Sequence, residues 1–212
     1  MIPKRFIRVW VGPKPIPELF EEWWQKFQDL HPDYEFKTIR GFDEVPVPDS
    51  FKKAIEGCTH YAGQSDIIRM LALYHIGGIY VDTDMLPLRS FESLRSQGQP
   101  FLGKRSGKAF EIAVMGSPKN HPAFGTLIQA FPAYHERNKH RATSVASGPA
   151  FYSSVLFGRP DVLHLPIRTF YPFDGWGGPK KSWRRKMFED PANFPKKMLA
   201  AHLSNHGWNK IF

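Results

Sequence analysis

Two aspartates separated by one residue, Asp82 and Asp84, directly follow the apolar run Ile79-Tyr80-Val81. If this run is a strand, its period of two places both carboxylates on the same side, where they can bind one hard cation through oxygen ligands. The alternative is that both acids are solvated turn residues, because an Asp-x-Asp sequence is common by chance. Their position at the end of an apolar strand favours the cation site.

A second pair of polar residues, Asp66 and Arg69, lies on the preceding segment, whose apolar spacing from Tyr61 to Ile76 predicts a helix. Residues three apart on a helix share a face. A carboxylate there can accept hydrogen bonds from sugar hydroxyls, and a guanidinium pairs with phosphate or with that carboxylate. The glycines Gly77-Gly78 allow a tight reversal into the strand and a close approach of the backbone to a ligand.

The elements that must position these residues alternate between strands and helices. Alternating apolar and polar residues predict strands at 6–11 and 34–39, joined by a helix at 17–30 with an aromatic buried face. Weaker patterns predict a strand at 112–115 and helices at 121–134 and 150–156. A strand, helix, strand unit is expected to be parallel with a right-handed crossover. The sequence therefore predicts an open α/β sheet with its site at the carboxyl edge of the strands.

Composition is typical of one globular domain covering residues 1–212. Of the 212 residues, 42% are hydrophobic and 23% are charged, which excludes a coiled coil or a disordered chain. No apolar run is long enough to cross a bilayer, and the first residues lack the apolar stretch of a signal peptide. The single cysteine, Cys58, cannot form an internal disulfide. We expect a soluble, cytoplasmic protein without a transmembrane segment.

The net charge of +9 is unevenly distributed along the chain. Residues 1–100 contain 12 Lys and Arg against 14 Asp and Glu, whereas residues 101–212 contain 17 against 6. One interpretation is a solvated basic face that aids solubility. The other is that the second half faces something anionic, which could be a phosphorylated substrate, a nucleic acid or an acidic membrane surface.

The segments Ala62–Arg69 and Gly77–Asp84 resemble the sugar-binding region containing the Asp-x-Asp motif in glycosyltransferase family 32 and in the related large clostridial glucosylating toxins. Similarity to this family continues along the chain at Ile2-Pro3-Lys4, Ile7, Trp10, Gly12, Ser147-Gly148-Pro149, Phe170-Tyr171-Pro172, His202 and Trp208. The resemblance implies a GT-A-like fold, a single Rossmann-type open sheet with helices on both faces and a loop-rich C-terminal part. Residues 1–100 would bind a UDP-sugar or GDP-sugar donor, and residues 101–212 would form a basic acceptor half.

The resemblance also implies roles for individual residues. Donor binding falls to Trp10, which would stack on the base, and to Ser65, Asp66, Arg69, Gly78, Tyr80, Asp82 and Trp208. Asp82 and Asp84 would bind Mn²⁺ or Mg²⁺, with His202 or His206 completing the site and favouring Mn²⁺. Taken alone, Trp10 would be assigned to the core and both histidines to the surface.

Two positions depart from the family pattern. Gly207 stands where the family usually has Ser before the closing Trp208. Glu111 stands on a strand where many relatives carry Asn or Gln, and its carboxylate could stabilise an oxocarbenium-like centre or act as a nucleophile. The alternative is a strand-edge Glu facing water. With Asp66, Arg69 and Asp82, Glu111 completes the set of candidate catalytic residues.

The implied activity is transfer of a sugar from a nucleoside diphosphate with retention of configuration. Basic residues interleaved with aromatic ones suit phosphates, bases and phosphorylated glycolipids, and the candidate acceptor-binding residues are Arg141, Lys181, Trp183, Arg184 and Arg185. We expect an anionic or glycan acceptor, either cell-surface or lipid-linked, and the basic residues also allow peripheral membrane contact. A hydroxylated base in DNA is the alternative acceptor. A non-catalytic nucleic-acid or carbohydrate binding module is a third interpretation, against which the intact acidic residues and Arg69 argue.

Overall fold

The computed structural model describes residues 1–104, 109–172 and 187–203. The strands are β1 (Arg5–Val9), β2 (Glu35–Ile39), β3 (Gly78–Val81), β4 (Met85–Pro87), β5 (Phe101–Lys104), β6 (Phe110–Ser117), β7 (Leu163–Leu165) and β8 (Ala200–His202). The helices are α1 (Glu18–Leu30), α2 (Lys52–Glu56), α3 (Tyr61–His75), α4 (Glu92–Arg95), α5 (Pro122–Asn138), α6 (Thr143–Ala146) and α7 (Pro149–Leu156). Single 3-10 turns lie at η1 (Phe42–Glu44), η2 (Asp49–Phe51), η3 (Ile167–Thr169) and η5 (Pro191–Asn193).

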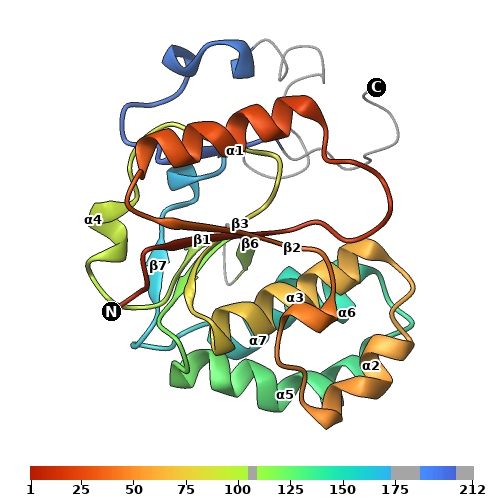
Figure 1. Cartoon of the computed structure of the whole chain (residues 1–212). Coiled ribbons are helices and arrows are strands. Elements are labelled where there is room, and N and C mark those ends of the chain that lie inside the picture. The colour runs from red at the N-terminus through yellow and green to blue at the C-terminus, as the bar shows by residue number, and fades with distance from the viewer. Residues whose placement is uncertain (105–108, 173–186, 204–212) are drawn as a thin grey trace.

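One six-stranded sheet runs through the molecule in the order β2-β1-β3-β6-β5-β7. The strands β2, β1 and β3 are parallel, whereas β6 is antiparallel to both β3 and β5. Figure 1 shows α1 on one face of this sheet and α3, α5 and α7 on the other. The predicted open α/β sheet is therefore confirmed, and strands from residues 1–100 and 101–212 belong to the same sheet.

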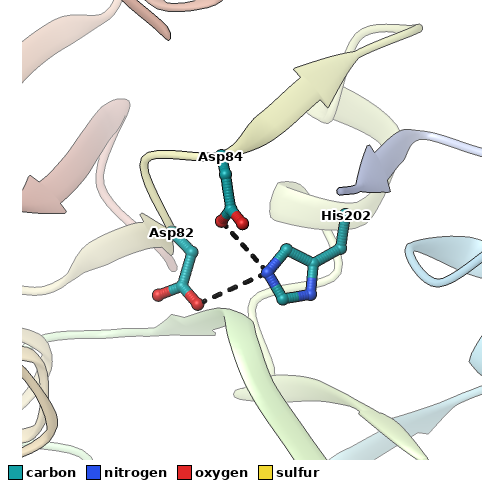
Figure 2. Close-up of side chains that lie close together, drawn as sticks. All are labelled: Asp82, Asp84 and His202. Carbon is teal, nitrogen blue, oxygen red and sulfur yellow. Dashed lines mark hydrogen bonds and ion pairs between the residues drawn. The ribbon is translucent and has the colours of Figure 1, made fainter. Parts of the chain in front are cut away.

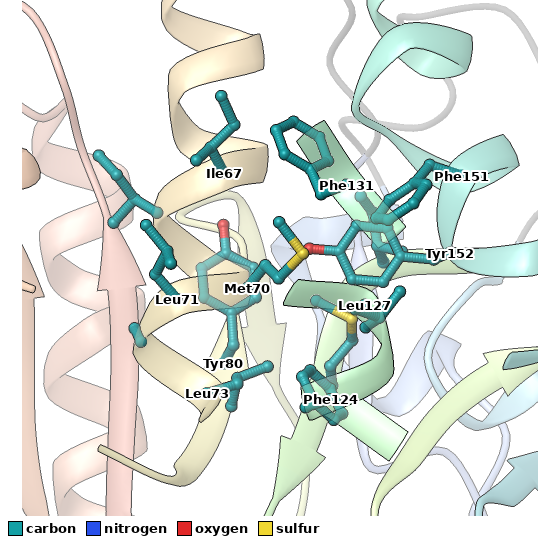
Figure 3. Close-up of a cluster of buried hydrophobic side chains, with 14 of the residues drawn as sticks. Ile67, Met70, Leu71, Leu73, Tyr80, Phe124, Leu127, Phe131, Phe151 and Tyr152 are labelled. Atoms are coloured by element: carbon teal, nitrogen blue, oxygen red, sulfur yellow. The ribbon is translucent and has the colours of Figure 1, made fainter. Parts of the chain in front are cut away.

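The larger hydrophobic core lies between the sheet and the helices α3, α5 and α7. Figure 3 shows its centre, where Met70 and Leu71 of α3 meet Tyr80 of β3 and the aromatic side chains Phe131 and Phe151. Each of these five side chains is at most 1% exposed. Helix α3 is buried around most of its circumference, which explains the broad apolar stripe in its sequence. This packing fixes the face of α3 that carries the polar residues of the site.

Helix α1 covers the opposite face of the sheet, as its sequence predicts. Phe20, Trp23, Trp24 and Phe27 are buried beneath it. None of the helices in the described parts of the chain combines the length and apolar composition needed to cross a lipid bilayer.

A second sheet consists of the two short strands β4 and β8, which pair in antiparallel orientation. Their register places His202 opposite Met85, the residue that follows Asp84. Three-residue strands are too short to produce a periodic pattern, and the sequence analysis therefore missed both. This pairing brings His202, near the end of the described residues, next to the Asp-x-Asp sequence.

The reversal between α3 and β3 depends on two glycines, as the sequence suggests. Gly77 and Gly78 have φ angles of 75° and 126°, in the region that disfavours other residues. A Cβ on Gly78 would lie 2.9 Å from the carbonyl oxygen of Arg5. The glycine therefore allows β3 to approach β1, and the structure places it at the start of β3, opposite the end that leads to Asp82.

Candidate active site

The Asp-x-Asp sequence lies in a turn that follows β3, at the carboxyl edge of the parallel strands. The Asp82 N–H donates a hydrogen bond to the Ala113 carbonyl of β6 (2.7 Å), and the Thr83 hydroxyl donates to the Val9 carbonyl of β1 (3.5 Å). Asp82 and Asp84 therefore lie at the predicted edge of the sheet. The prediction that a strand period of two places both carboxylates on one side is wrong, because β3 ends at Val81. The turn that follows β3 determines the positions of the two carboxylates.

Asp82 and Asp84 converge on His202 of β8 (Figure 2). The His202 Nε2 lies 3.0 Å from Asp84 Oδ1 and 3.7 Å from Asp82 Oδ2. One ligand atom from each of the three residues lies within 4.8 Å of the others. Two carboxylate oxygens and an imidazole nitrogen form a donor set that suits Mn²⁺, and the residues present therefore fit a divalent metal ion.

His202 carries a proton in the arrangement that the structure records. Burial alone would lower the pKa of the imidazole, but Asp84, which hydrogen bonds to it, and then Asp82 raise the pKa to about 9. The imidazolium supplies positive charge between two carboxylates. A metal ion that binds here must displace this proton, since a histidine ligand is neutral.

Arg69 links the helix α3 to the turn after β3. Its guanidinium lies 3.2 Å from Asp66 Oδ1 and 2.9 Å from Asp82 Oδ1, and its Nη1 donates to the Ile112 carbonyl at 3.0 Å. The guanidinium carbon also lies 4.4 Å from the centre of the Tyr80 ring. With only 6% of its surface exposed, Arg69 is a buried cation whose position is fixed by several partners.

Asp82 belongs to both groups of residues. Its Oδ1 accepts a hydrogen bond from the Tyr80 hydroxyl (2.6 Å) and pairs with Arg69, whereas its Oδ2 faces His202. The Asp66–Arg69 pair and the Asp84–His202 pair are therefore connected through one carboxylate.

Asp66 is buried, and its partners include residues that sequence analysis did not assign to it. The Ser147 hydroxyl donates to Asp66 Oδ2 (3.1 Å), and the Tyr152 hydroxyl donates to the Asp66 carbonyl (3.0 Å). Burial raises the pKa of Asp66 to about 6, although Arg69 opposes this rise. A Cβ on Gly148 would lie 3.2 Å from Asp66 Oδ2. Ser147 and Gly148 belong to the run Ser147-Gly148-Pro149 that resembles the family, but sequence spacing alone does not pair them with Asp66.

Two further candidate donor-binding residues lie at the same edge. Ser65 accepts two hydrogen bonds from Arg69, through its carbonyl (3.3 Å) and its hydroxyl (3.2 Å). Trp10 follows β1 directly, packs against the apolar cluster under α1, and donates from its indole N–H to the Lys14 carbonyl (2.7 Å). Trp10 thus combines a core contact with a position at the carboxyl edge of the sheet. The structure does not bring Gly78 into this group.

Glu111 lies on β6, an interior strand between β3 and β5. At Glu111 the strand pairs with Gly103 of β5, the side chain is partly exposed, and its catalytic role stays a prediction. Its charge is close enough to contribute to the raised pKa values of His202 and Tyr171.

Of the candidate acceptor-binding residues, one lies within the described residues. Arg141 is exposed on the segment that precedes α6. The remaining candidates fall outside the described residues, namely Lys181, Trp183, Arg184, Arg185, His206 and Trp208.

The fold is that of the GT-A glycosyltransferases. The structure is similar to the PaToxG glycosyltransferase, with a TM-score of 0.63 at 19% sequence identity, over 73% of this chain and 69% of that one. At this identity the similarity establishes the fold.

Residues 17–100 match the family described as glycosyltransferase sugar-binding region containing DXD motif. This match confirms the resemblance to glycosyltransferase family 32 over residues 17–100. They contain Asp66, Arg69, Asp82 and Asp84.

Curated relatives carry glycosyltransferase names. Inositol phosphoceramide mannosyltransferase 3 of Schizosaccharomyces pombe is 28% identical over 161 residues, which is 73% of this chain and 44% of the relative. Mannosyl phosphorylinositol ceramide synthase SUR1 of Saccharomyces cerevisiae is 30% identical over 153 residues, 66% of this chain and 38% of the relative. The chain thus spans less than half the length of these relatives.

Proposed function

We propose that this protein is a metal-dependent, retaining glycosyltransferase that moves a sugar from a nucleoside diphosphate sugar to an anionic, lipid-linked acceptor. The observation that carries the proposal is the connection, through Asp82, of the Asp84–His202 pair to the Asp66–Arg69 pair. Asp82 thus joins the Asp84–His202 pair, which is suited to binding a cation, to the Asp66–Arg69 pair, which is suited to binding a sugar. The family match and the names of the relatives support the glycosyltransferase class.

Mn²⁺ is the proposed cofactor, held by Asp82, Asp84 and His202. When bound, it would neutralise charge on the departing diphosphate and orient it. The three residues come from the turn after β3 and from β8, and the pairing of β4 with β8 keeps them together in the folded chain.

The chain's own contribution would be to hold charge and hydrogen-bonding groups in place before the donor binds. Arg69 is fixed by Asp66, by the Ile112 carbonyl and by the Tyr80 ring, so little reorganisation is needed when it meets the donor. Asp66 would accept hydroxyl groups of the transferred sugar. In a front-side retaining route the leaving phosphate takes the acceptor proton, and no strong base is required of these residues.

The acceptor we propose is a phosphorylated glycolipid headgroup. The names of both curated relatives refer to phosphorylated inositol ceramides, which are anionic. The excess of positive charge in residues 101–212 complements such an acceptor. In the described part of this half, Arg137, Lys139 and Arg141 lie close together in sequence around the end of α5. Charge is the only observation that favours a hydroxylated DNA base instead.

The direct test is turnover of GDP-mannose and UDP-galactose, with Mn²⁺ and with a chelator. We expect release of free sugar, or transfer to phosphatidylinositol in detergent, only when Mn²⁺ is present. Equal turnover in chelator would overturn the metal dependence. Binding of these donors with Mn²⁺ but without any turnover would favour the non-catalytic binding module.

A further inference from the structure

Tyr171 lies beside the candidate metal site. It belongs to a segment that contains none of the candidate site residues named above. It follows η3, and the backbone at this point is held next to β8, because the His202 N–H donates to the Phe170 carbonyl (2.9 Å). The Tyr171 ring meets the His202 ring edge to face, with 5.7 Å between centroids and an angle of 81°. The side chain of Tyr171 is therefore in contact with a candidate metal ligand.

The position of the Tyr171 ring depends on a glycine in the neighbouring strand. A Cβ on Gly103 of β5 would lie 2.6 Å from Cε2 of the ring, which is closer than any real contact. The glycine at this position lets the ring pack closely against β5. The ring is thus held between β5 and His202.

The hydroxyl of Tyr171 is buried, and among the described residues it has no hydrogen-bond partner. Tyr171 as a whole is only 4% exposed. Buried polar atoms in native proteins nearly always have a partner, and an exception calls for an explanation, of which an absent ligand is one. A phenylalanine at this position would fill the same space without that cost.

The surroundings of this hydroxyl are acidic. Burial, and then the charges of Glu111 and Asp82, raise the pKa of Tyr171 well above its ordinary value. The N–H groups of Val114 and Ala113 lie close enough to oppose this rise, although neither forms a hydrogen bond with it. The hydroxyl therefore lies beside β6, near both Glu111 and Asp82.

An irregularity in β6 gathers these groups. The register between β5 and β6 shifts after Leu102, which pairs with Met115, so that Gly103 pairs with Glu111. Within this stretch of β6, the Ile112 carbonyl accepts from Arg69 and the Ala113 carbonyl accepts from the Asp82 N–H. Such bulges commonly redirect side chains beside active sites. Tyr171, Arg69 and Asp82 all meet β6 here.

We propose that the hydroxyl of Tyr171 binds a hydroxyl group of the transferred sugar, which makes Tyr171 a specificity-determining residue. This inference rests on the proposed function. The nearby carboxylates disfavour a phosphate at this point, whereas a neutral hydroxyl that can both donate and accept suits another hydroxyl. Because the ring touches His202, the sugar concerned is the one attached to the diphosphate. A site that leaves a polar group unpaired without the right hydroxyl discriminates strongly between sugars.

The test compares affinities for sugar-bearing and sugar-free nucleotides in the presence of Mn²⁺. Calorimetry of the wild type and of Tyr171→Phe would use GDP-mannose and UDP-galactose, with GDP and UDP as the matched sugar-free probes. We expect Tyr171→Phe to bind the preferred nucleotide sugar about 5- to 10-fold more weakly, the worth of one hydrogen bond, and to bind the nucleoside diphosphate unchanged. Without ligand, the variant should melt at the same or a higher temperature.

Two further variants control the interpretation. Tyr34→Phe removes a hydroxyl that binds Glu92 and none of the candidate site residues, and should change neither affinity. Gly103→Ala should displace the Tyr171 ring and weaken sugar binding while the hydroxyl is still present. If Tyr171→Phe loses affinity equally for the nucleotide sugar and the nucleoside diphosphate, or loses none, the proposed role of Tyr171 is wrong. The proposed function would not be affected by that result. Failure of the wild type to bind any of the four nucleotides would overturn the proposed function and this inference with it.

Discussion

The buried guanidinium of Arg69 and the partly exposed carboxylate of Asp82 form an ion pair, with 2.9 Å between Nη1 and Oδ1. This pair joins the helix α3 to the turn after β3. Replacing either residue therefore affects both the position of the other and the charge balance of the site. A buried pair that loses one partner leaves an uncompensated charge, which costs about 3–5 kcal/mol.

Arg69→Lys should retain the charge but lose the contacts that hold the guanidinium. A lysine cannot contact Asp66, Asp82 and the Ile112 carbonyl at the same time, because its ammonium is a compact point charge. We expect kcat/KM to fall by about 100-fold, in line with the loss of a preorganised electrostatic group. Steady-state kinetics would measure this, with the exposed Arg137→Lys as the matched control. An unchanged kcat/KM would show that Arg69 is not required in this geometry.

Asp84→Asn should remove Mn²⁺ binding while leaving the fold intact. Asp84 contributes one of the three candidate ligand atoms and pairs with His202 Nε2 at 3.0 Å. Loss of an outer partner alone weakens metal sites by about 10- to 100-fold, and loss of a ligand should cost at least as much. The measurement is a Mn²⁺ titration followed by electron paramagnetic resonance. Asp43→Asn, outside the site, serves as the control and should bind Mn²⁺ like the wild type.

Asp66 should make the stability of the protein depend on pH. Its folded pKa of about 6 lies above the ordinary value of 3.8, so the folded state favours the protonated carboxyl. The resulting stabilisation is complete below pH 3.8 and is lost as the pH rises through 6. The shift corresponds to about 3 kcal/mol.

Asp66→Asn isolates this contribution, because the amide does not titrate. Urea unfolding across this pH range should show the wild type losing about 3 kcal/mol relative to the variant as the pH rises. The difference between the two proteins cancels the other titrating groups. A constant difference at all pH values would show that the folded and unfolded pKa values of Asp66 are equal.

Gly148→Ala should disturb Asp66 without removing any polar group. The new Cβ would lie 2.9 Å from the Ser144 Cα and 3.2 Å from Asp66 Oδ2, so either α6 or the carboxylate must move. We expect a loss of about 1–3 kcal/mol in stability and a higher KM for the donor. Gly57→Ala is the matched control, since its Cβ would meet its nearest neighbour at 3.4 Å. An unchanged KM would mean that the carboxylate position is not critical.

Charge reversal around the end of α5 should weaken binding to an anionic lipid surface. The variant combines Arg137→Glu, Lys139→Glu and Arg141→Glu and is tested by sedimentation with vesicles containing phosphatidylinositol. Because each basic residue near such a surface contributes about 1 kcal/mol, the loss should exceed 10-fold. Hydrolysis of the donor by the variant should be normal. Duplex DNA binding at low salt, with no vesicle binding, would favour the nucleic-acid acceptor instead.

The sequence predicts the elements that carry strong periodicity. The aromatic stripe of α1, the apolar stripe of α3 and the alternation in β1 and β2 each appear in the structure close to their predicted bounds. The strand predicted at 112–115 is longer than expected, because β6 is an interior strand that pairs on both sides. The helix predicted at 121–134 likewise continues to Asn138.

The candidate site was predictable where its residues are close in sequence. Asp66 with Arg69 and Asp82 with Asp84 could be paired from their spacing. Ser147 could not be assigned to Asp66, nor Tyr171 to His202, because these contacts depend on how the elements pack. His202 itself was proposed only through the family resemblance, since its strand is three residues long.

The pairing of β4 with β8 also determines when, during synthesis and folding, the candidate metal site can form. His202 is separated from Asp84 by 118 positions along the chain, and contacts of such long range form late because closing the loop costs entropy. During translation, a nascent chain that already contains Asp82 and Asp84 still lacks His202, the third residue of the candidate metal site. Binding of the proposed metal ion by these three residues would therefore require that translation has passed His202 and that β8 has paired with β4.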